Sequence, residues 1–144
     1  MITIQEMNGH ARKLSAAYER SLLPLSRQTC MTATAISILL FLDNNPDFAT
    51  ARDICQMRGL KRAIVSTHVE RLAQEGLLQR RDCPGDRRKD ILVCTPKAQP
   101  LIEAGRKVQT EFAQSVLEGL SAQQLAVMEQ CFQIMDRNMD KLIG

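Results

Sequence analysis

The chain has 144 residues, of which 44% are hydrophobic and 24% charged, a length that suits one domain with a real core. No apolar run approaches the roughly 20 residues that a membrane helix needs, and the N-terminus lacks a signal-peptide pattern, so we expect a soluble, cytoplasmic protein without a membrane partner. Five cysteines without a Cys-x-x-Cys pair argue against a disulfide framework and a structural zinc site, and favour reduced thiols.

The formal net charge of +3 is modest, but it is unevenly distributed. Residues 52–90 hold ten basic and six acidic groups, whereas the segments before and after them are close to balance. A localised basic patch is the electrostatic footprint of a nucleic-acid-binding protein, and the alternative is an ordinary solvated surface. Residues 52–90 are therefore the first candidate for a functional surface.

The N-terminal third predicts two helices of different character. Apolar residues spaced by three and four indicate an amphipathic helix from Ile4 to about Pro24. Residues 26–31 are predicted to form a connector. Either Thr32 or Thr34 then caps a second helix, which is so apolar that we expect it to be buried on more than one side.

Two short helices are predicted next. Thr50 can cap the first of them, Asp53 completes a capping box, and Gly59 ends the helix. The second runs from about Lys61 to Gln74, because apolar residues there have helical spacing, and its opposite face is small or polar. The apolar stripe comprises Val65, Val69 and Leu72, and the opposite face comprises Ala63, Ser66, Thr67, Glu70 and Gln74.

A basic hairpin follows the second helix, which Gly76 ends. Residues 77–82 and 91–95 are predicted to be paired strands that flank a basic tip at residues 83–90. Helix, turn, helix and basic wing thus follow one another in a single run.

The C-terminal third predicts two long amphipathic helices. Pro96 and Pro100 mark the start of the first helix, which stops at Gly119, and Ser121 with Gln124 opens the second through a capping box. The apolar stripe of the first comprises Leu101, Ala104, Val108, Phe112 and Val116, and that of the second comprises Leu125, Met128, Phe132, Met135, Met139 and Leu142. A final helix this apolar needs a partner.

Residues 65–80, 86–88 and 92–97 resemble the winged helix of the MarR family of bacterial transcription regulators, and a looser similarity extends over nearly the whole chain. The resemblance implies a mainly α fold with a small β-hairpin wing, a winged helix-turn-helix with flanking dimerisation helices. It implies a single domain over residues 1–144. Residues 32–96 would form the DNA-binding lobe, and residues 1–25 and 97–144 the dimerisation helices.

A homodimer is expected for two reasons. The first helix and the last two cannot all bury their apolar stripes against so small a winged helix, and in MarR-type proteins these terminal helices interlock between two subunits. The alternative is an intramolecular bundle. By resemblance, we expect a sequence-specific regulator of double-stranded DNA, a homodimeric repressor on an inverted-repeat operator that a small-molecule ligand releases.

The second helix of the helix-turn-helix would enter the major groove. Ser66 and Thr67 let the backbone come close, Ala63 can touch a thymine methyl group, and Glu70 can accept from a cytosine amine. Phosphates would be met by the flanking basic residues Lys61, Arg62 and Arg71. The alternatives are an exposed, silent helix face and, for Glu70, a salt bridge to a neighbouring arginine.

The wing concentrates like charge in Arg87, Arg88 and Lys89, which is costly unless an anion is near. By resemblance to the family, Arg88 would reach into the minor groove, where an arginine gains from the negative potential, and Asp86 would position it through a charge-assisted hydrogen bond. A merely solvated hairpin is the alternative.

A ligand site is implied by the resemblance, because MarR-type proteins bind small, often phenolic, molecules between the dimerisation helices and the DNA-binding lobe. Here that crevice could be lined by His10, Leu14, Tyr18, Phe41 and residues near Arg27 and Cys30. Ordinary packing explains each of these side chains as well.

Two other functions stay open. Cysteine oxidation is one trigger, and Cys83 and Cys94 could face each other across the wing, because they are equidistant from the expected tip. An architectural winged helix that does not read DNA sequence is the other.

An enzyme is not expected. His10 and His68 are the only histidines, and neither has the spacing of a metal site or a catalytic triad. No glycine-rich phosphate loop is present. We therefore expect no catalytic residues, no metal and no cofactor.

Overall fold

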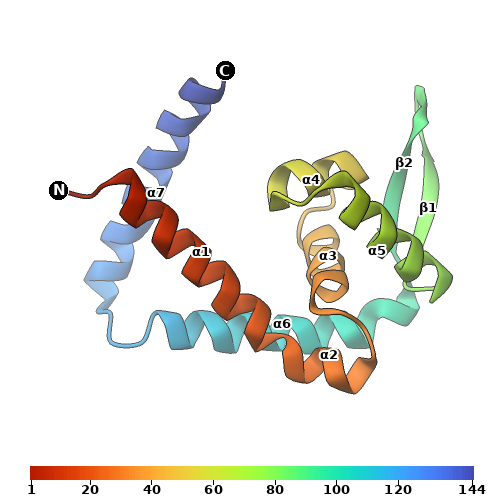
Figure 1. Ribbon diagram of the computed structural model, residues 1–144, viewed down its shortest axis with the longest axis horizontal. Helices are drawn as coiled ribbons and strands as arrows, with labels where there is room; N and C mark the ends of the chain where they lie inside the picture. Colours follow the sequence, from red (N-terminus) through yellow and green to blue (C-terminus); the bar gives the residue numbers. More distant parts are fainter. The chain divides into compact units, whose positions relative to one another are not determined.

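The computed structural model describes all 144 residues and has the expected fold class, a mainly helical chain with one antiparallel hairpin (Figure 1). The chain divides into two compact units, residues 1–112 and residues 113–144. The elements are α1 Ile4–Ser21, α2 Leu23–Thr29, α3 Ala33–Asn44, α4 Ala51–Arg58, α5 Arg62–Gln74, β1 Leu78–Cys83, β2 Asp86–Cys94, a 3-10 turn at Pro96–Ala98, α6 Gln99–Val116 and α7 Ala122–Ile143.

Helix α3 is the centre of the core in residues 1–112. Nine of its 12 residues are buried, so the expectation of burial on more than one side is confirmed. Helices α4 and α5 and strand β2 pack around it, and contribute buried side chains such as Ile54, Leu72 and Leu92. No single helix is long and apolar enough to cross a membrane, and only the bent pair Ile4–Thr29 with Ala33–Asn44 passes on length and composition.

The helix starts are encoded locally, as the capping patterns predict. Thr50 Oγ1 accepts a hydrogen bond from the Asp53 backbone N–H at 3.1 Å, and the Asp53 carboxylate accepts from the Thr50 backbone N–H at 3.1 Å. Ser121 and Gln124 form the same reciprocal pair at the start of α7. Of the two threonines that could cap α3, Thr32 does so, accepting from the Ala35 N–H at 3.1 Å.

The expected connector at residues 26–31 is wrong. Helix α2 covers Leu23–Thr29, with Pro24 in its first turn, where a proline is tolerated because the first N–H groups have no helical partner. The proline therefore begins a new helix and does not simply end α1. The chain turns after α2 at Cys30, which has a left-handed backbone with φ of 54°.

The hairpin is longer than expected, and its turn is tighter. Strands β1 and β2 are joined by Pro84 and Gly85 alone, because Gly85 has φ of 85°, which a residue without Cβ adopts at little cost. The basic residues expected at the tip therefore lie on strand β2. The expected pairing of Cys83 with Cys94 is also wrong, since Cys94 lies opposite Leu78 and Cys83 lies opposite Asp86.

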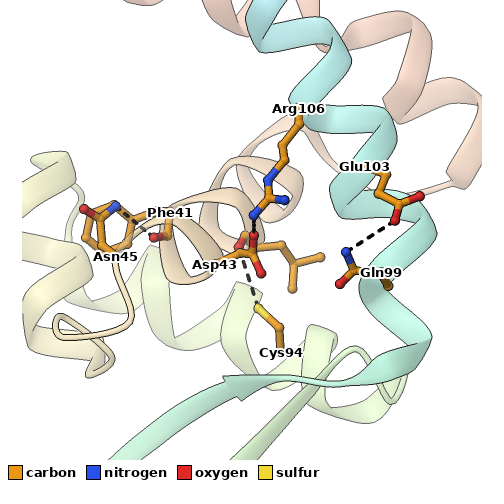
Figure 2. Close-up of polar contacts among 8 residues, drawn as sticks. Phe41, Asp43, Asn45, Cys94, Gln99, Glu103 and Arg106 are labelled. Carbon is orange, nitrogen blue, oxygen red and sulfur yellow. Dashed lines mark hydrogen bonds and ion pairs between the residues drawn. The ribbon is translucent and has the colours of Figure 1, made fainter.

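Helix α6 packs on α3 through a glycine. A Cβ atom at Gly105 would lie 2.9 Å from both Cδ atoms of Leu40, so a larger residue there would have to displace the Leu40 side chain. Figure 2 shows the polar contacts beside this packing: Arg106 pairs with Asp43 at the end of α3, and the Cys94 thiol donates to the Leu39 carbonyl at 3.7 Å. Charge and packing together hold α6 to the core.

Helix α7, in residues 113–144, has the expected apolar spacing but no buried residue. The same holds for α1 in the other unit. Exposed apolar side chains include Val127, Phe132, Ile134, Met139 and Leu142 on α7, and Ile4 and Leu14 on α1.

Candidate nucleic-acid interface

Helix α5 exposes the face that its sequence pattern predicts. Val65, Val69 and Leu72 are at most 3% exposed, while the predicted DNA-facing residues are all exposed. The Thr67 hydroxyl donates to the Ala63 carbonyl at 2.9 Å, so its oxygen can still accept a hydrogen bond. These exposed residues are Lys61, Arg62, Ala63, Ser66, Thr67, Glu70 and Arg71.

One edge of α5 is tied to the start of α3. The Arg71 guanidinium donates to the Cys30 carbonyl at 3.2 Å, and His68 Nδ1 lies 3.3 Å from Thr32 Oγ1. These contacts hold the helix in one orientation on the core. Arg71 is therefore partly engaged within the protein.

The two faces of the hairpin differ in what they carry. Leu78 and Leu92 point to the core at the base of the strands, and Arg80 is paired with Leu92 and so lies on the same face. Arg88 lies nearer the tip, in the stretch of β2 without paired residues between Asp86 and Asp90, and the Asp86 carboxylate accepts from its backbone N–H at 2.9 Å. Asp86 thus holds the main chain of Arg88 and not its guanidinium.

A hollow of about 770 Å³ lies between α4, α5 and the hairpin, and we call it the wing hollow. Five of the predicted site residues line it: Arg62, Ser66, Asp86, Arg88 and Lys89. The other predicted residues, Lys61, Ala63, Thr67, Glu70, Arg71 and Arg87, lie outside it. Its remaining lining residues are Thr50, Ala51, Arg52, Cys55, Val69, Arg80, Asp90 and Leu92.

Sequence reasoning missed Arg52 and Arg80 as members of this site. A signal for Arg80 was present, because it lies two residues after the buried Leu78 and therefore on the same face of the strand. A signal for Arg52 was its position just after the helix cap Thr50, where a cation is unfavourable. Neither signal reveals that the two arginines share one hollow.

The basic groups of this region have no acidic partners. The ion pairs in the structure are Arg106 with Asp43, and Lys107 with Glu111, so none of the ten basic side chains of residues 52–90 is in one. The salt bridge considered for Glu70 is likewise absent. Free guanidinium groups around a hollow are suited to bind phosphate oxygens.

A second hollow, of about 630 Å³, lies among α1, α3, α4 and α6, and we call it the helix cavity. Tyr18 and Phe112 pack with ring centroids 5.4 Å apart, and the Tyr18 hydroxyl accepts from Gln109 Nε2 at 2.8 Å. Arg58 donates to the hydroxyl of Ser37, the one buried polar side chain. The lining residues are Leu14, Ser15, Tyr18, Glu19, Leu22, Ala33, Thr34, Ser37, Met57, Arg58, Leu60, Gln109 and Phe112.

Of the residues expected in a ligand crevice, Leu14 and Tyr18 line the helix cavity, whereas His10, Arg27 and Phe41 do not. Phe41 is 8% exposed and belongs to the core, because α3 is buried on all sides. Arg27 belongs to helix α2, and it lines a separate hollow. His10 lies one helical turn before Leu14 and is exposed.

The MarR family model matches residues 31–89 of this chain. The winged helix is that of the MarR family. The MarR-type segment runs from the start of α3 to Lys89 on β2, and so contains α4, α5 and most of the wing hollow. The family resemblance of the sequence is therefore confirmed.

Solved MarR proteins have the same fold over nearly the whole chain. Apo MarR from E. coli is 17% identical, with a TM-score of 0.70 over 94% of this chain and 98% of that one. A putative MarR family regulator from Listeria monocytogenes, complexed with a 26mer DNA, is 13% identical, with a TM-score of 0.75 over 96% and 89%. A further MarR family transcription regulator is 25% identical, with a TM-score of 0.71 over 96% and 89%.

The chain has no grouping of three or more His, Cys, Asp or Glu side chains that could hold a metal ion. All five cysteines are free thiols. Burial raises the pKa of the Cys94 thiol above its usual value, which disfavours the reactive thiolate.

Proposed function

We propose that this MarR-type chain is a cytoplasmic transcription regulator that binds double-stranded DNA as a homodimer and reads an inverted-repeat operator, acting as a repressor that a small aromatic ligand releases. The observation that carries the proposal is the pairing of an exposed, small-residue face on α5 with a basic, unpaired wing hollow beside it. No catalytic step or cofactor is part of the proposal.

Each part of the DNA-binding surface has a role in this proposal. The α5 face enters the major groove, where Ala63, Ser66, Thr67 and Glu70 meet base edges. Phosphates are met by Lys61, Arg62 and Arg71, which fix the register without reading sequence. On the wing, Arg88 enters the minor groove, Asp86 supports its main chain, and Arg87 and Lys89 add positive charge.

The homodimer is supported by the exposed apolar residues of the terminal helices. Residues 1–25 and 97–144 are proposed to be dimerisation helices around a DNA-binding lobe at residues 32–96. Within these segments, neither α1 nor α7 has a buried residue, and the large apolar side chains of Phe132 and Ile134 on α7 are more than half exposed. Exposed apolar surface of this kind marks interaction sites. Light scattering should give twice the mass of 16.2 kDa at micromolar concentration, and a monomer would overturn this part.

Ligand release is supported by the walls of the helix cavity. Its volume lies within the range of small-molecule sites, and it combines two aromatic rings with a few polar groups. Met57 and Arg58 lie at the end of α4, and Leu60 lies in the turn that leads to α5. A ligand that displaces Arg58 from Ser37 would therefore act directly on the helix-turn-helix.

The experiment that tests the function is selection of bound duplexes from a random DNA pool by the purified protein, at near-physiological salt, followed by sequencing. We expect an enriched inverted repeat, with half-sites about one helical turn, roughly 10 base pairs, apart. The loss of enrichment in Arg88→Ala, with Arg87→Ala as the matched control, would tie the selection to the wing. Binding without enrichment would contradict sequence reading and favour an architectural protein.

A further inference from the structure

Resting on the proposed function, we infer that Arg52 and Arg80 bind phosphates of one DNA strand, so that the wing hollow is a seat for the sugar–phosphate backbone. Both residues lie outside the recognition helix and the wing tip. Arg52 comes from α4 and Arg80 from the middle of β1, and both line the hollow together with Arg62 and Arg88.

The register of the hairpin directs Arg80 into the hollow. Arg80 lies opposite Leu92, and both line the hollow, whereas the next residue, Arg81, lies opposite Ile91 and does not. Successive side chains on a strand point to opposite faces, so two adjacent arginines lie on opposite faces of the hairpin. The face that packs on the core at Leu78 thus continues outward as arginine.

Arg52 lies where the protein itself offers no compensation for a cation. It occupies the first turn of α4, where the aligned peptide dipoles disfavour positive charge. The neighbouring Asp53 carboxylate is already engaged, since it accepts from the Thr50 N–H at 3.1 Å and from the Thr50 hydroxyl at 2.7 Å. Arg52 forms no ion pair. An external anion would supply the missing partner.

The whole hollow has the same imbalance. Five cationic side chains line it against the two carboxylates Asp86 and Asp90, and Asp86 already accepts from the Arg88 backbone N–H. Like charges in one hollow repel one another unless an anion lies between them. The hollow opens beside the exposed face of α5 at Ser66, so a duplex whose major groove receives α5 brings phosphates to it.

The chemistry of the two side chains makes the inference measurable. An arginine fork binds phosphate oxygens in a bidentate manner, and each phosphate neutralised on duplex DNA releases condensed counterions. The logarithm of the binding constant therefore falls with the logarithm of salt concentration with a slope of about −0.9 for each contact. Loss of one contact makes the slope shallower by that amount.

The test is a salt titration by fluorescence anisotropy, with a selected duplex and a random-sequence duplex of equal length. Wild type is compared with Arg52→Ala and Arg80→Ala. The matched control is Arg81→Ala, which removes the same charge from the opposite face of the same strand. Arg52→Lys and Arg80→Lys keep a charge that can still meet a phosphate.

We expect each alanine variant to make the slope shallower by about 0.9 and to weaken binding to both duplexes by the same factor. Arg81→Ala should keep the wild-type slope, and the lysine variants should retain most of it. Slopes equal to wild type in both alanine variants, with the fold intact by circular dichroism, would overturn the inference. So would a loss confined to the selected duplex, which indicates base reading.

Failure of the proposed function gives a different result. If wild type binds both duplexes equally, the proposal that the protein reads DNA sequence is wrong. Shallower slopes in Arg52→Ala and Arg80→Ala would still support the backbone seat. If wild type binds neither duplex, both proposals are wrong.

Discussion

The two hollows of residues 1–112 share helix α4 as a wall but differ in how they use arginine. On the side of the wing hollow, Arg52 and its neighbours are without acidic partners, whereas in the helix cavity Arg58 donates to the buried Ser37 hydroxyl. The first hollow is strongly basic, and the second contains an aromatic pair and a single arginine. Side chains of one type are thus left without an acidic partner or make an internal contact, according to the environment that packing provides.

The largest expected effect comes from a substitution that loosens helix α4, the wall that the two hollows share. Ile54 on α4 is fully buried, so Ile54→Ala should lower the free energy of unfolding by about 2–5 kcal/mol, through lost burial and the cavity that remains. Urea denaturation followed by circular dichroism measures this. DNA binding at the wing hollow and ligand binding at the helix cavity should weaken together. A variant with wild-type stability would contradict the idea that the packing of α4 on the core supports both hollows.

The wing hollow should respond next. Arg88→Ala should weaken DNA binding at least tenfold, which corresponds to about 1.4 kcal/mol or more, whereas Arg87→Ala, one residue away and outside the hollow, should have a smaller effect. Anisotropy with the selected duplex measures both. Equal losses in the two variants would mean that the hollow does not distinguish them.

The helix cavity can be tested without disturbing the wing hollow. Tyr18 is the one tyrosine in a chain without tryptophan, so the intrinsic fluorescence reports on this cavity alone. We expect 4-nitrophenol to quench it saturably, and Ser15→Phe, which fills the cavity from an exposed position on α1, to weaken that binding about tenfold or more.

The control for this test is Ala17→Phe, on the same helix but outside the cavity lining. It should keep the wild-type quenching curve. Where light scattering shows that the variants keep the mass of wild type, their DNA affinity without ligand should stay within about twofold of wild type, because neither position touches the wing hollow. Unsaturable quenching in wild type would contradict a ligand role for the cavity.

The cysteines should react according to burial. The raised pKa of Cys94 and its bond to the Leu39 carbonyl predict slower alkylation at pH 8 than at the exposed Cys30 and Cys131. Mass spectrometry over time measures the rates. Mild peroxide should leave DNA affinity unchanged, and a clear loss of affinity would revive thiol sensing.

The smallest expected effect concerns the start of α1. Backbone and side-chain hydrogen bonds from Thr3 hold the pKa of Glu6 below its usual value of 4.5. A group with a lowered folded-state pKa contributes stability above its unfolded pKa and loses it as pH falls through the folded pKa. Below about pH 4.5, the protection factors of the amides at the start of α1, which correct for the intrinsic pH dependence of hydrogen exchange, should therefore fall. Glu6→Gln should remove this dependence, and neither hollow should change.

Most local structure could be predicted from the sequence, because its causes lie within a few residues. The capping pair Thr50 and Asp53 and the stripe of Val65, Val69 and Leu72 depend only on spacing along one helix. The same local patterns identified the winged helix, and the MarR family match confirms it. The exposed face of α5 follows from the same periodicity.

Only the tertiary structure decided which residues that are distant in the sequence lie next to one another. The tight turn at Gly85 and the register irregularity at Asp82 and Cys83 give a strand pairing other than the predicted one, which separates Cys83 from Cys94 and places Arg88 on a strand. Arg52 and Arg80 are 28 positions apart, and no local pattern links them. Helix periodicity is set by backbone hydrogen bonds within four residues, whereas a hollow depends on how distant elements pack. For that reason the sequence determined the winged helix, and the packing of α4, α5 and β2 around α3 determined which of its arginines share one site.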